Sequence, residues 1–352
     1  MYDTDRDEKT MEKPTIRISV RNLVEFILRS GDLDSRRGNI DKEAMLKGGR
    51  LHRKIQKQMG KEYRAEVPLK METEYEDLII AVEGRADGIF TESGKAVIDE
   101  IKGIYGNVDL MKEPVKVHRA QAMCYACIYG KKENLQEIGI QMTYANLDTE
   151  VIRRFSETLS MDEVTSWYQE LLDSYHKWVS YSQQWKKERN ETIQSLEFPF
   201  PYREGQRKMV SSVYHTILAG RQIFIQAPTG VGKTMSTIFP AVRAIGEGKG
   251  ETLFYLTAKT ITRTVAREAF DVLQKNGLKY KVVTITAKEK LCFMEETKCN
   301  PGDCPYARGH FDRVNDAVFD LWTTEHIYDR EQILEYAKKW QVCPFEMCLD
   351  LS

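Results

Sequence analysis

Asp87, Glu100 and Lys102 are the residues of this sequence whose types and spacing best suit catalysis. Ser93-Gly94 lies between two apolar runs and suits a two-residue hairpin turn. With that turn, residues pair across the hairpin when their numbers sum to 187, which places Asp87 opposite Glu100 with their Cβ atoms about 5 Å apart. Two carboxylates at this separation repel each other unless a divalent cation bridges them, and carboxylate oxygens suit Mg²⁺ or Mn²⁺. The pattern predicts a cation site on one face of the hairpin.

The alternation of side chains along a strand decides which neighbouring acid joins this site. Asp99 points to the opposite face from Lys102, whereas Glu100 shares the face of Lys102. Lys102 could then orient or deprotonate a water that attacks phosphorus, while the cation polarises the phosphoryl oxygen and lowers the pKa of water. These residues together predict metal-dependent hydrolysis of a phosphodiester.

A second signature, Ala227–Thr234 (APTGVGKT), is typical of an ATP-binding phosphate loop. The loop follows the apolar segment Gln222–Gln226 and precedes a helical pattern. Backbone N–H groups around Thr229, Gly230 and Gly232 would hold phosphate oxygens. Lys233 would reach the β and γ phosphates, and Thr234 would ligate Mg²⁺ at the start of the helix.

The cysteines form a third group, because five of the seven follow Leu291. An odd number without an export signal argues against a disulfide framework and leaves metal binding open. The candidate ligands have separations x6, x4 and x38: Cys292, Cys299, Cys304 and Cys343. Four thiolates suit a [4Fe–4S] cluster or zinc, and Cys348 could substitute for Cys299. Cys124 and Cys127 form a CxxC on an apolar helix and are interpreted as core residues.

The elements that must position these residues fall into two series. Helical patterns over 19–31 and 43–59, the latter carrying His52, precede a strand-rich stretch over 64–102. A helix with Gln121 and Tyr125, a strand near 137–145 and a helix from 161 to about 191 follow. A domain junction is expected near 188–198. Beyond it, 223–225 and 252–256 have the pattern of buried parallel strands, each followed by a helix.

Composition limits the function classes only loosely. The 352 residues are enough for two domains, and 52 basic against 53 acidic residues give a net charge of -1, so nucleic-acid binding must rely on local basic surfaces. No stretch approaches the run of about 20 apolar residues that spans a bilayer, and the polar start is not a signal peptide. We expect a soluble, cytoplasmic protein with no membrane partner.

The first series of elements resembles the RecB-type PD-(D/E)xK nucleases over roughly residues 19–150. The likeness is carried by His52, Gly84–Asp87, Ile98–Lys102 and Gln121–Tyr125, in that order and spacing. It implies that His52, Asp87 and Glu100 hold the metal, that Lys102 is catalytic, and that Gln121 and Tyr125 support the site and the DNA. Some relatives carry an iron–sulfur cluster within the nuclease domain. The flanking cysteines for that cluster are missing here, so it is not expected.

The second series resembles superfamily 2 helicases, in which Ala227 is a familiar replacement for the first glycine of the loop. Pro201–Gln206 is similar to their adenine-reading segment, which makes Gln206 a nucleotide contact. Leu256–Thr260 and Thr262-Arg263 are similar to their motif Ia, which contacts the DNA backbone. The surroundings of the last cysteines resemble the iron–sulfur insertion of XPD/DinG-like helicases, which favours [4Fe–4S] over zinc.

Nothing after Lys233 resembles the box that holds the catalytic Mg²⁺ of such helicases, and no second motor lobe follows. We therefore expect the rest of the motor C-terminal to residue 352 or in another chain, and no ATP hydrolysis from these residues alone. The expected fold is α/β: a PD-(D/E)xK nuclease domain, with a mixed sheet flanked by helices, then an incomplete RecA-like P-loop domain with a small iron–sulfur insertion. The expected divisions are a disordered tail 1–18, nuclease 19–190, linker 191–198, motor lobe 199–288 and iron–sulfur domain 289–352.

These resemblances imply a DNA repair helicase–nuclease that cuts DNA with Mg²⁺ or Mn²⁺ and moves 5′ to 3′ on single-stranded or forked DNA. A catalytically inactive nuclease fold that serves as a DNA clamp is one alternative. An RNA helicase is another, which the likeness to a nuclease disfavours.

Overall fold

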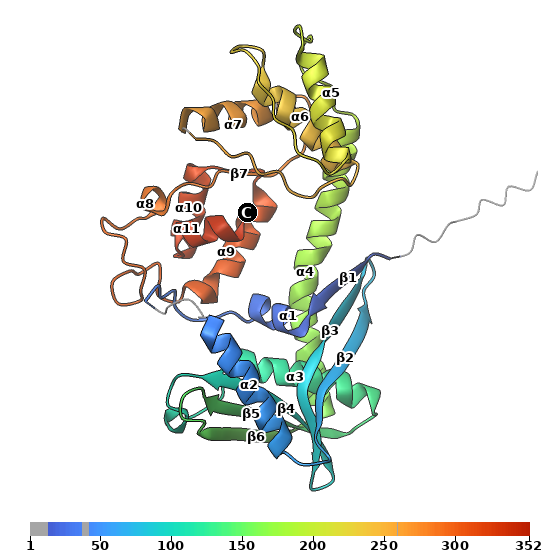
Figure 1. Cartoon of the computed structure of the whole chain (residues 1–352), viewed down its shortest axis with the longest axis vertical. Helices are drawn as coiled ribbons and strands as arrows, with labels where there is room; N and C mark the ends of the chain where they lie inside the picture. Colours follow the sequence, from blue (N-terminus) through green and yellow to red (C-terminus); the bar gives the residue numbers. More distant parts are fainter. Residues whose placement is uncertain (1–12, 37–41, 259) are drawn as a thin grey trace, which may run out of the picture. The chain divides into compact units, whose positions relative to one another are not determined.

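The computed structural model describes residues 13–36, 42–258 and 260–352. These residues form two compact units (Figure 1). The first unit extends to Ser180 and includes Lys298–Asn315; the second comprises Tyr181–Thr297 and Asp316–Ser352. The chain is mixed α/β, with the large sheet in the first unit.

The first unit contains a mixed six-stranded sheet with the order β1-β3-β4-β5-β6, in which β2 also pairs with β3. Its strands are β1 (Thr15–Ser19), β2 (Arg64–Glu74), β3 (Ile79–Glu92), β4 (Lys95–Ile104), β5 (Glu137–Asn146) and β6 (Ile152–Ser160). The pairs β1–β3 and β4–β5 are parallel, and the other pairs are antiparallel. The helices of the first unit are α1 (Val20–Ile27), α2 (Lys42–Gln58), η1 (Val108–Leu110), α3 (Lys116–Lys132) and the first half of α4 (Met161–Gln194).

Helices cover both faces of this sheet because its central strands β4 and β5 are buried and apolar on both. Ile98 packs in the main core with residues of α1, α3 and α4, whereas Ile101, three positions on, packs against Leu51 and Ile55 of α2. Figure 1 shows α2 in front of β4 and β5, with α3 behind them. Burying one such aliphatic side chain contributes about 1.5–3 kcal/mol, so these contacts hold α2 and α3 in place.

The sequence-based expectation for the N-terminal tail is partly wrong. Residues 15–18 were expected in a disordered tail, but Thr15–Ser19 forms β1, parallel to β3. Ile16 and Ile18 are partly buried against the main core, and this burial stabilises the strand. Residues 1–12 of the expected tail lie outside the described residues.

The expected hairpin register is confirmed as far as the ladder extends, but the expected pair of Asp87 with Glu100 is not part of it. The β3–β4 ladder runs from Glu92 opposite Lys95 to Gly88 opposite Asp99. Ser93 and Gly94 have φ values of 51° and 80°, the left-handed conformation that a two-residue type I′ turn requires at both positions.

The second unit is mainly helical. Its helices are the second half of α4, α5 (Gln206–Leu218), α6 (Lys233–Gly246), α7 (Thr260–Lys275), α8 (Lys288–Leu291), most of α9 (His310–Thr324), α10 (Arg330–Trp340) and α11 (Pro344–Asp350). Its short parallel strands are β7 (Val282–Val283) and β8 (Ile327–Tyr328). No helix in the described ranges has both the length and the apolar character needed to cross a membrane.

The expected buried strands at 223–225 and 252–256 do not form in the structure. Phe224 is 95% exposed and Leu256 is 89% exposed. A parallel strand needs backbone partners and cover on its faces. Within the described residues neither segment is part of a sheet, although the helices expected after them, α6 and α7, are present.

Candidate functional site

The candidate site begins at Asp87 on β3, directly before Gly88, where the β3–β4 ladder ends. By the hairpin register Ile101 would lie opposite Ala86, yet no pair beyond Gly88 and Asp99 is formed. Instead the N–H of Ile101 donates to Asp87 Oδ2 at 2.7 Å, and the Ile101 carbonyl oxygen lies 3.0 Å from His52 Nε2. Because buried backbone polar groups must be satisfied, these two side chains take over the role of the missing strand partner.

His52 and Asp87 are in direct contact. His52 Nε2 lies 3.1 Å from Asp87 Oδ2, and the burial of Leu51 and Ile55 on either side of His52 fixes its helix on the sheet. Burial disfavours a charged imidazole, but the Asp87 carboxylate and the Ile101 carbonyl outweigh this and raise the pKa of His52. The ring nitrogen lies about one hydrogen-bond length from both the carboxylate oxygen and the carbonyl oxygen, so the three atoms are close enough to share one cation.

Glu100 and Lys102 form an ion pair on the face of β4 that α3 covers. Lys102 Nζ lies 2.7 Å from Glu100 Oε1 and donates to Gln121 Oε1 at 2.8 Å. Glu100 Oε2 is buried and has no hydrogen-bond partner among the described residues. Burial, followed by the charge of Asp87, raises the pKa of Glu100 to about 7, while Lys102 opposes this rise. A buried carboxylate oxygen without a donor is a group that a bound cation would satisfy.

Asp99 is separate from this arrangement, as the alternation predicts. It accepts hydrogen bonds from Tyr63 Oη at 2.9 Å, Thr143 Oγ1 at 2.6 Å and Gln141 Nε2 at 3.1 Å. Because these three donors satisfy the fully buried Asp99 carboxylate, Asp99 is not available to bind a cation.

Tyr125 supports β3 at the point where the strand lacks a β4 partner. The tyrosine lies on α3, one turn after Gln121, and packs against the backbone of Gly84 and Arg85. A Cβ atom at Gly84 would lie only 2.6 Å from Tyr125 Oη, so this close approach requires glycine. Gln121 therefore orients Lys102, and Tyr125 braces the strand that carries Asp87.

Sequence reasoning missed Glu66. Its neighbours Ala65 and Val67 pair with Gly88 and Ala86, so Glu66 faces Asp87 across β2 and β3. Within the described residues, His52, Glu66 and Asp87 form a group whose candidate ligand atoms lie within 4.8 Å of one another. The expected trio of His52, Asp87 and Glu100 is therefore only partly assembled, since Glu100 binds Lys102 instead. No tight-turn signal separates β2 from β3, so the sequence did not fix the pairing that would have identified Glu66.

The donor set fits a hard divalent cation. Within the described residues it offers the imidazole of His52 and the carboxylates of Glu66 and Asp87, and Glu100 has a buried oxygen without a donor. Carboxylate-rich sites of this kind suit Mg²⁺ or Mn²⁺.

The predicted phosphate loop lies in the second unit directly before α6, although the strand expected before it does not form. Gly230 and Gly232 have φ values of 86° and 78°, and α6 begins at Lys233 with Thr234 in its first turn. Lys233 Nζ donates to the carbonyl oxygens of Ala227 at 3.0 Å and Pro228 at 2.9 Å, so it folds back over the loop. Thr229, also expected to contact nucleotide, is exposed on the loop.

Gln206, the expected adenine contact, lies against this loop. It is buried, and its Oε1 accepts the Arg203 N–H at 3.0 Å. A Cβ atom at Gly232 would lie 2.5 Å from Gln206 Nε2, so the structure brings Gln206 next to the phosphate loop. Arg203 donates to the Gly230 carbonyl oxygen on the same loop.

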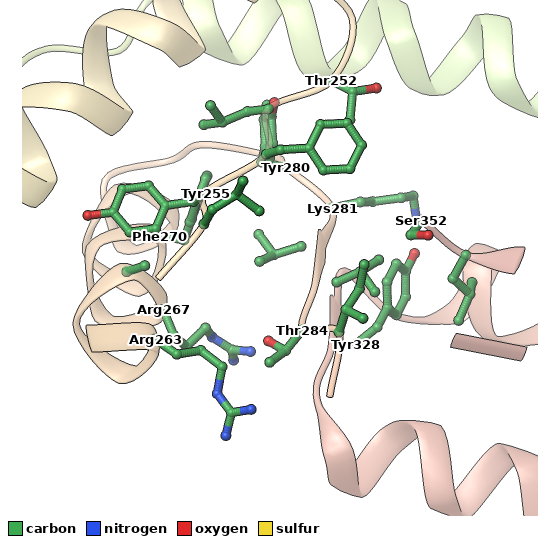
Figure 2. Close-up of a pocket in the computed structure, with 18 of the residues that line it drawn as sticks. Thr252, Tyr255, Arg263, Arg267, Phe270, Tyr280, Lys281, Thr284, Tyr328 and Ser352 are labelled. Atoms are coloured by element: carbon green, nitrogen blue, oxygen red, sulfur yellow. The ribbon is translucent and has the colours of Figure 1, made fainter. Parts of the chain in front are cut away.

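A cavity of about 590 Å³ adjoins the segment similar to motif Ia (Figure 2). Arg263 and Arg267 extend from α7 on one side of it, with Thr284 opposite them. Burial lowers the pKa of Lys281, at another part of the cavity, to about 8. Lys259 of the motif lies outside the described residues.

The cysteines expected to hold a cluster are divided between the units. Cys299 and Cys304 belong to the first unit, and Cys292 and Cys343 to the second. Cys348 is fully buried, its Sγ lies 4.0 Å from the Thr284 carbonyl oxygen, and burial raises the pKa of its thiol to about 11. Cys124 and Cys127 are buried in the main core, as expected.

Comparison with known proteins bears mainly on the second unit. Residues 205–305, which contain the phosphate loop, match the DEAD/DEAH box helicase family. This chain carries a helicase-type segment. A stretch of 47 residues is 43% identical to the probable ATP-dependent helicase MJ0942 of Methanocaldococcus jannaschii, which is 13% of this chain and 7% of that protein. The helicase-type segment supports binding of ATP and nucleic acid.

Among solved structures, the crystal structure of SSO0001 is similar over 44% of this chain and 75% of that one, at 18% identity and a TM-score of 0.29. This likeness is too low to establish a shared fold.

Proposed function

We propose that the first unit is a metal-dependent nuclease carried on the same chain as the helicase-type segment. The observation that carries the proposal is the interrupted β3–β4 ladder. There the side chains of Asp87 and His52 contact the backbone N–H and carbonyl oxygen of Ile101, and Glu100 and Lys102 form an ion pair on the same strand. Interruptions of regular strand pairing are common next to active sites, where they redirect a side chain toward the site. A purely structural sheet would gain nothing from leaving Glu100 Oε2 buried without a donor.

Each residue has a defined part in this proposal. His52, Asp87 and Glu100 would hold Mg²⁺ or Mn²⁺, which when bound polarises the phosphoryl oxygen and lowers the pKa of water. Glu100 and Gln121 hold Lys102 with its ammonium group beside the Glu100 carboxylate, where it would orient the attacking water. Tyr125 keeps the Asp87 strand in place.

The second unit extends the proposal to a motor that works on DNA. Gln206, Lys233 and Thr234 would bind ATP with Mg²⁺, and the likeness to XPD/DinG-type helicases gives 5′ to 3′ movement on single-stranded or forked DNA. Cys292, Cys299, Cys304 and Cys343 would hold a [4Fe–4S] cluster. The curated helicase relative matches over only 7% of its length, so the activity of the whole protein is part of the proposal.

The nuclease is tested by cleavage of end-labelled single-stranded DNA with Mg²⁺ or Mn²⁺ and without ATP. We expect cutting by the wild type that falls by about 10²-fold or more in Glu100→Gln and Lys102→Ala, because both remove charge from the reacting centre. Lys95→Ala is the matched control: Lys95 is on the same strand, at the hairpin end, and pairs with Glu137. DNA binding without cutting under any metal would support the inactive clamp instead. Competition between DNA and RNA strands separates a DNA enzyme from an RNA helicase.

The cluster is tested by anaerobic purification. A brown protein with about four irons per chain supports the assignment, and a colourless protein with one zinc contradicts it.

A further inference from the structure

The imidazole of His52 has a carboxylate near each of its two nitrogens. Nε2 lies 3.1 Å from Asp87 Oδ2, and Nδ1 lies 4.0 Å from Glu66 Oε1. The two acids come from adjacent strands and face each other across the β2–β3 pair. One histidine on α2 is thus placed between them.

The position of Glu66 is built into the structure. Gln56, one helical turn after His52, donates from Nε2 to Glu66 Oε1 at 3.0 Å and to the Asp87 carbonyl oxygen at 2.9 Å. Glu66 itself has φ 54°, a left-handed conformation that is unfavourable for a residue with a side chain. Gln56 therefore ties the Glu66 carboxylate and the Asp87 strand to the helix that carries His52.

The chemistry of metal-binding histidines assigns the two nitrogens different tasks. One nitrogen offers its lone pair to the cation, while the N–H of the other donates to an acceptor that fixes the tautomer and the ring orientation. In this site Nε2 lies within hydrogen-bond distance of two acceptors, Asp87 Oδ2 and the Ile101 carbonyl oxygen. A cation that replaced the Nε2 proton would be shared by the same three atoms, so Nε2 is the nitrogen for the cation. Nδ1 is left to carry the proton, and the acceptor it faces is Glu66.

We propose that Glu66 is a positioning residue that keeps His52 protonated on Nδ1 and thereby presents the Nε2 lone pair to a divalent cation. This inference rests on the proposed cation-dependent site, and it deepens that proposal. The separation of 4.0 Å between Nδ1 and Glu66 Oε1 is longer than a direct hydrogen bond, and the Glu66 side chain is 48% exposed. Glu66 acts through His52 and does not itself ligate the cation.

The test measures Mn²⁺ binding to the full chain through the decrease in the electron paramagnetic resonance signal of free Mn²⁺. Glu66→Ala is expected to weaken Mn²⁺ affinity by about 10–100-fold, the usual effect of removing an outer partner of a ligating histidine. Glu66→Gln keeps an oxygen acceptor for Nδ1–H and is expected to restore most of the affinity. Glu72→Ala, on the same strand and paired with Lys70, is the matched control and should bind as the wild type does. Asp87→Ala, which removes a proposed ligand, reports on the site itself.

Pulsed measurements of nitrogen coupling to the bound Mn²⁺ distinguish positioning from direct ligation. The proposal predicts that the coupling from His52 is strong in the wild type and Glu66→Gln and is reduced in Glu66→Ala. If Glu66→Gln were as weak as Glu66→Ala while the coupling persisted in both, Glu66 would be a direct ligand and the positioning role would be wrong. Unchanged affinity in Glu66→Ala with loss of binding in Asp87→Ala would overturn this inference alone. No Mn²⁺ binding by the wild type would overturn the cation site and this inference together. Circular dichroism of each variant confirms that the sheet is intact.

Discussion

The Asp87 carboxylate accepts the backbone N–H of Ile101 at 2.7 Å, in the place where the β3–β4 ladder would otherwise supply an acceptor. One side chain therefore completes the sheet and faces the candidate cation site at the same time. A change at Asp87 therefore affects both stability and cation binding, and variants that keep or remove the acceptor oxygen separate the two effects.

Asp87→Asn and Asp87→Ala should differ in stability but not in cation binding. The Asn side chain retains an oxygen that can accept the Ile101 N–H, whereas Ala leaves that buried donor unsatisfied at a cost of about 1–3 kcal/mol. Both changes remove the charged ligand and should abolish Mn²⁺ binding. Urea unfolding and Mn²⁺ titration measure the two effects. Equal stability of the two variants would show that the Ile101 contact is unimportant for folding.

Gly84→Ala should destabilise the first unit by about 1–3 kcal/mol, because the new methyl group would lie 2.6 Å from Tyr125 Oη. Tyr125→Phe removes that hydroxyl and should recover part of the loss. Thermal unfolding of the two single variants and the double variant measures the coupling. Strictly additive losses would mean that the two residues do not press on each other.

The free energy of unfolding of the metal-free protein should fall as pH rises because Glu100 loses its proton. Burial and the Asp87 charge raise the pKa of Glu100 to about 7 from an ordinary 4.5. Between these values the folded protein binds a proton that the unfolded chain has released, so the free energy of unfolding falls with rising pH. The slope is at most about 1.4 kcal/mol per pH unit.

The difference between the wild type and Glu100→Gln isolates this effect. His118 and His310, whose pKa values burial lowers to about 4, act in the opposite direction, since each binds a proton only when unfolded between about pH 4 and 6.5. Urea unfolding in EDTA, repeated at several pH values between about 5 and 6.5, measures the free energy of unfolding of both proteins. A difference that stays constant over this range would contradict a raised pKa for Glu100.

Glu66→Gly should stabilise the fold and weaken cation binding. Glycine adopts the φ of 54° without strain, which is worth on the order of 1 kcal/mol, but it removes the acceptor that faces His52. Ser93→Gly is a matched control, because Ser93 has φ 51° at the hairpin turn. It should gain similar stability and leave Mn²⁺ affinity unchanged. A loss of stability in Glu66→Gly would argue that the Glu66 contacts outweigh the backbone strain.

The parts of the site that the sequence predicted are those fixed by local geometry. The turn at Ser93-Gly94 determines the hairpin register, and the register with its alternation places Glu100 with Lys102 and apart from Asp99. Sequence reasoning did not show that the ladder ends at Gly88, because the break depends on His52 from a distant helix.

The features that the sequence did not predict correctly depend on pairing between segments that are distant along the chain. Glu66 reaches the site only through the β2–β3 pairing, for which the chain between the strands gives no short-turn signal. The apolar runs at 223–225 and 252–256 have the composition of strands, but a strand also needs neighbours, and none of the described residues supplies them.

The most direct test of the cation site is anomalous diffraction at the manganese edge from crystals of the full chain soaked in Mn²⁺. The structure predicts a Mn²⁺ peak beside His52 Nε2 and Asp87 Oδ2, on the side of Glu100, that disappears in Asp87→Ala crystals. Mn²⁺ peaks at other carboxylates, with none beside well-ordered His52 and Asp87 side chains, would contradict the account.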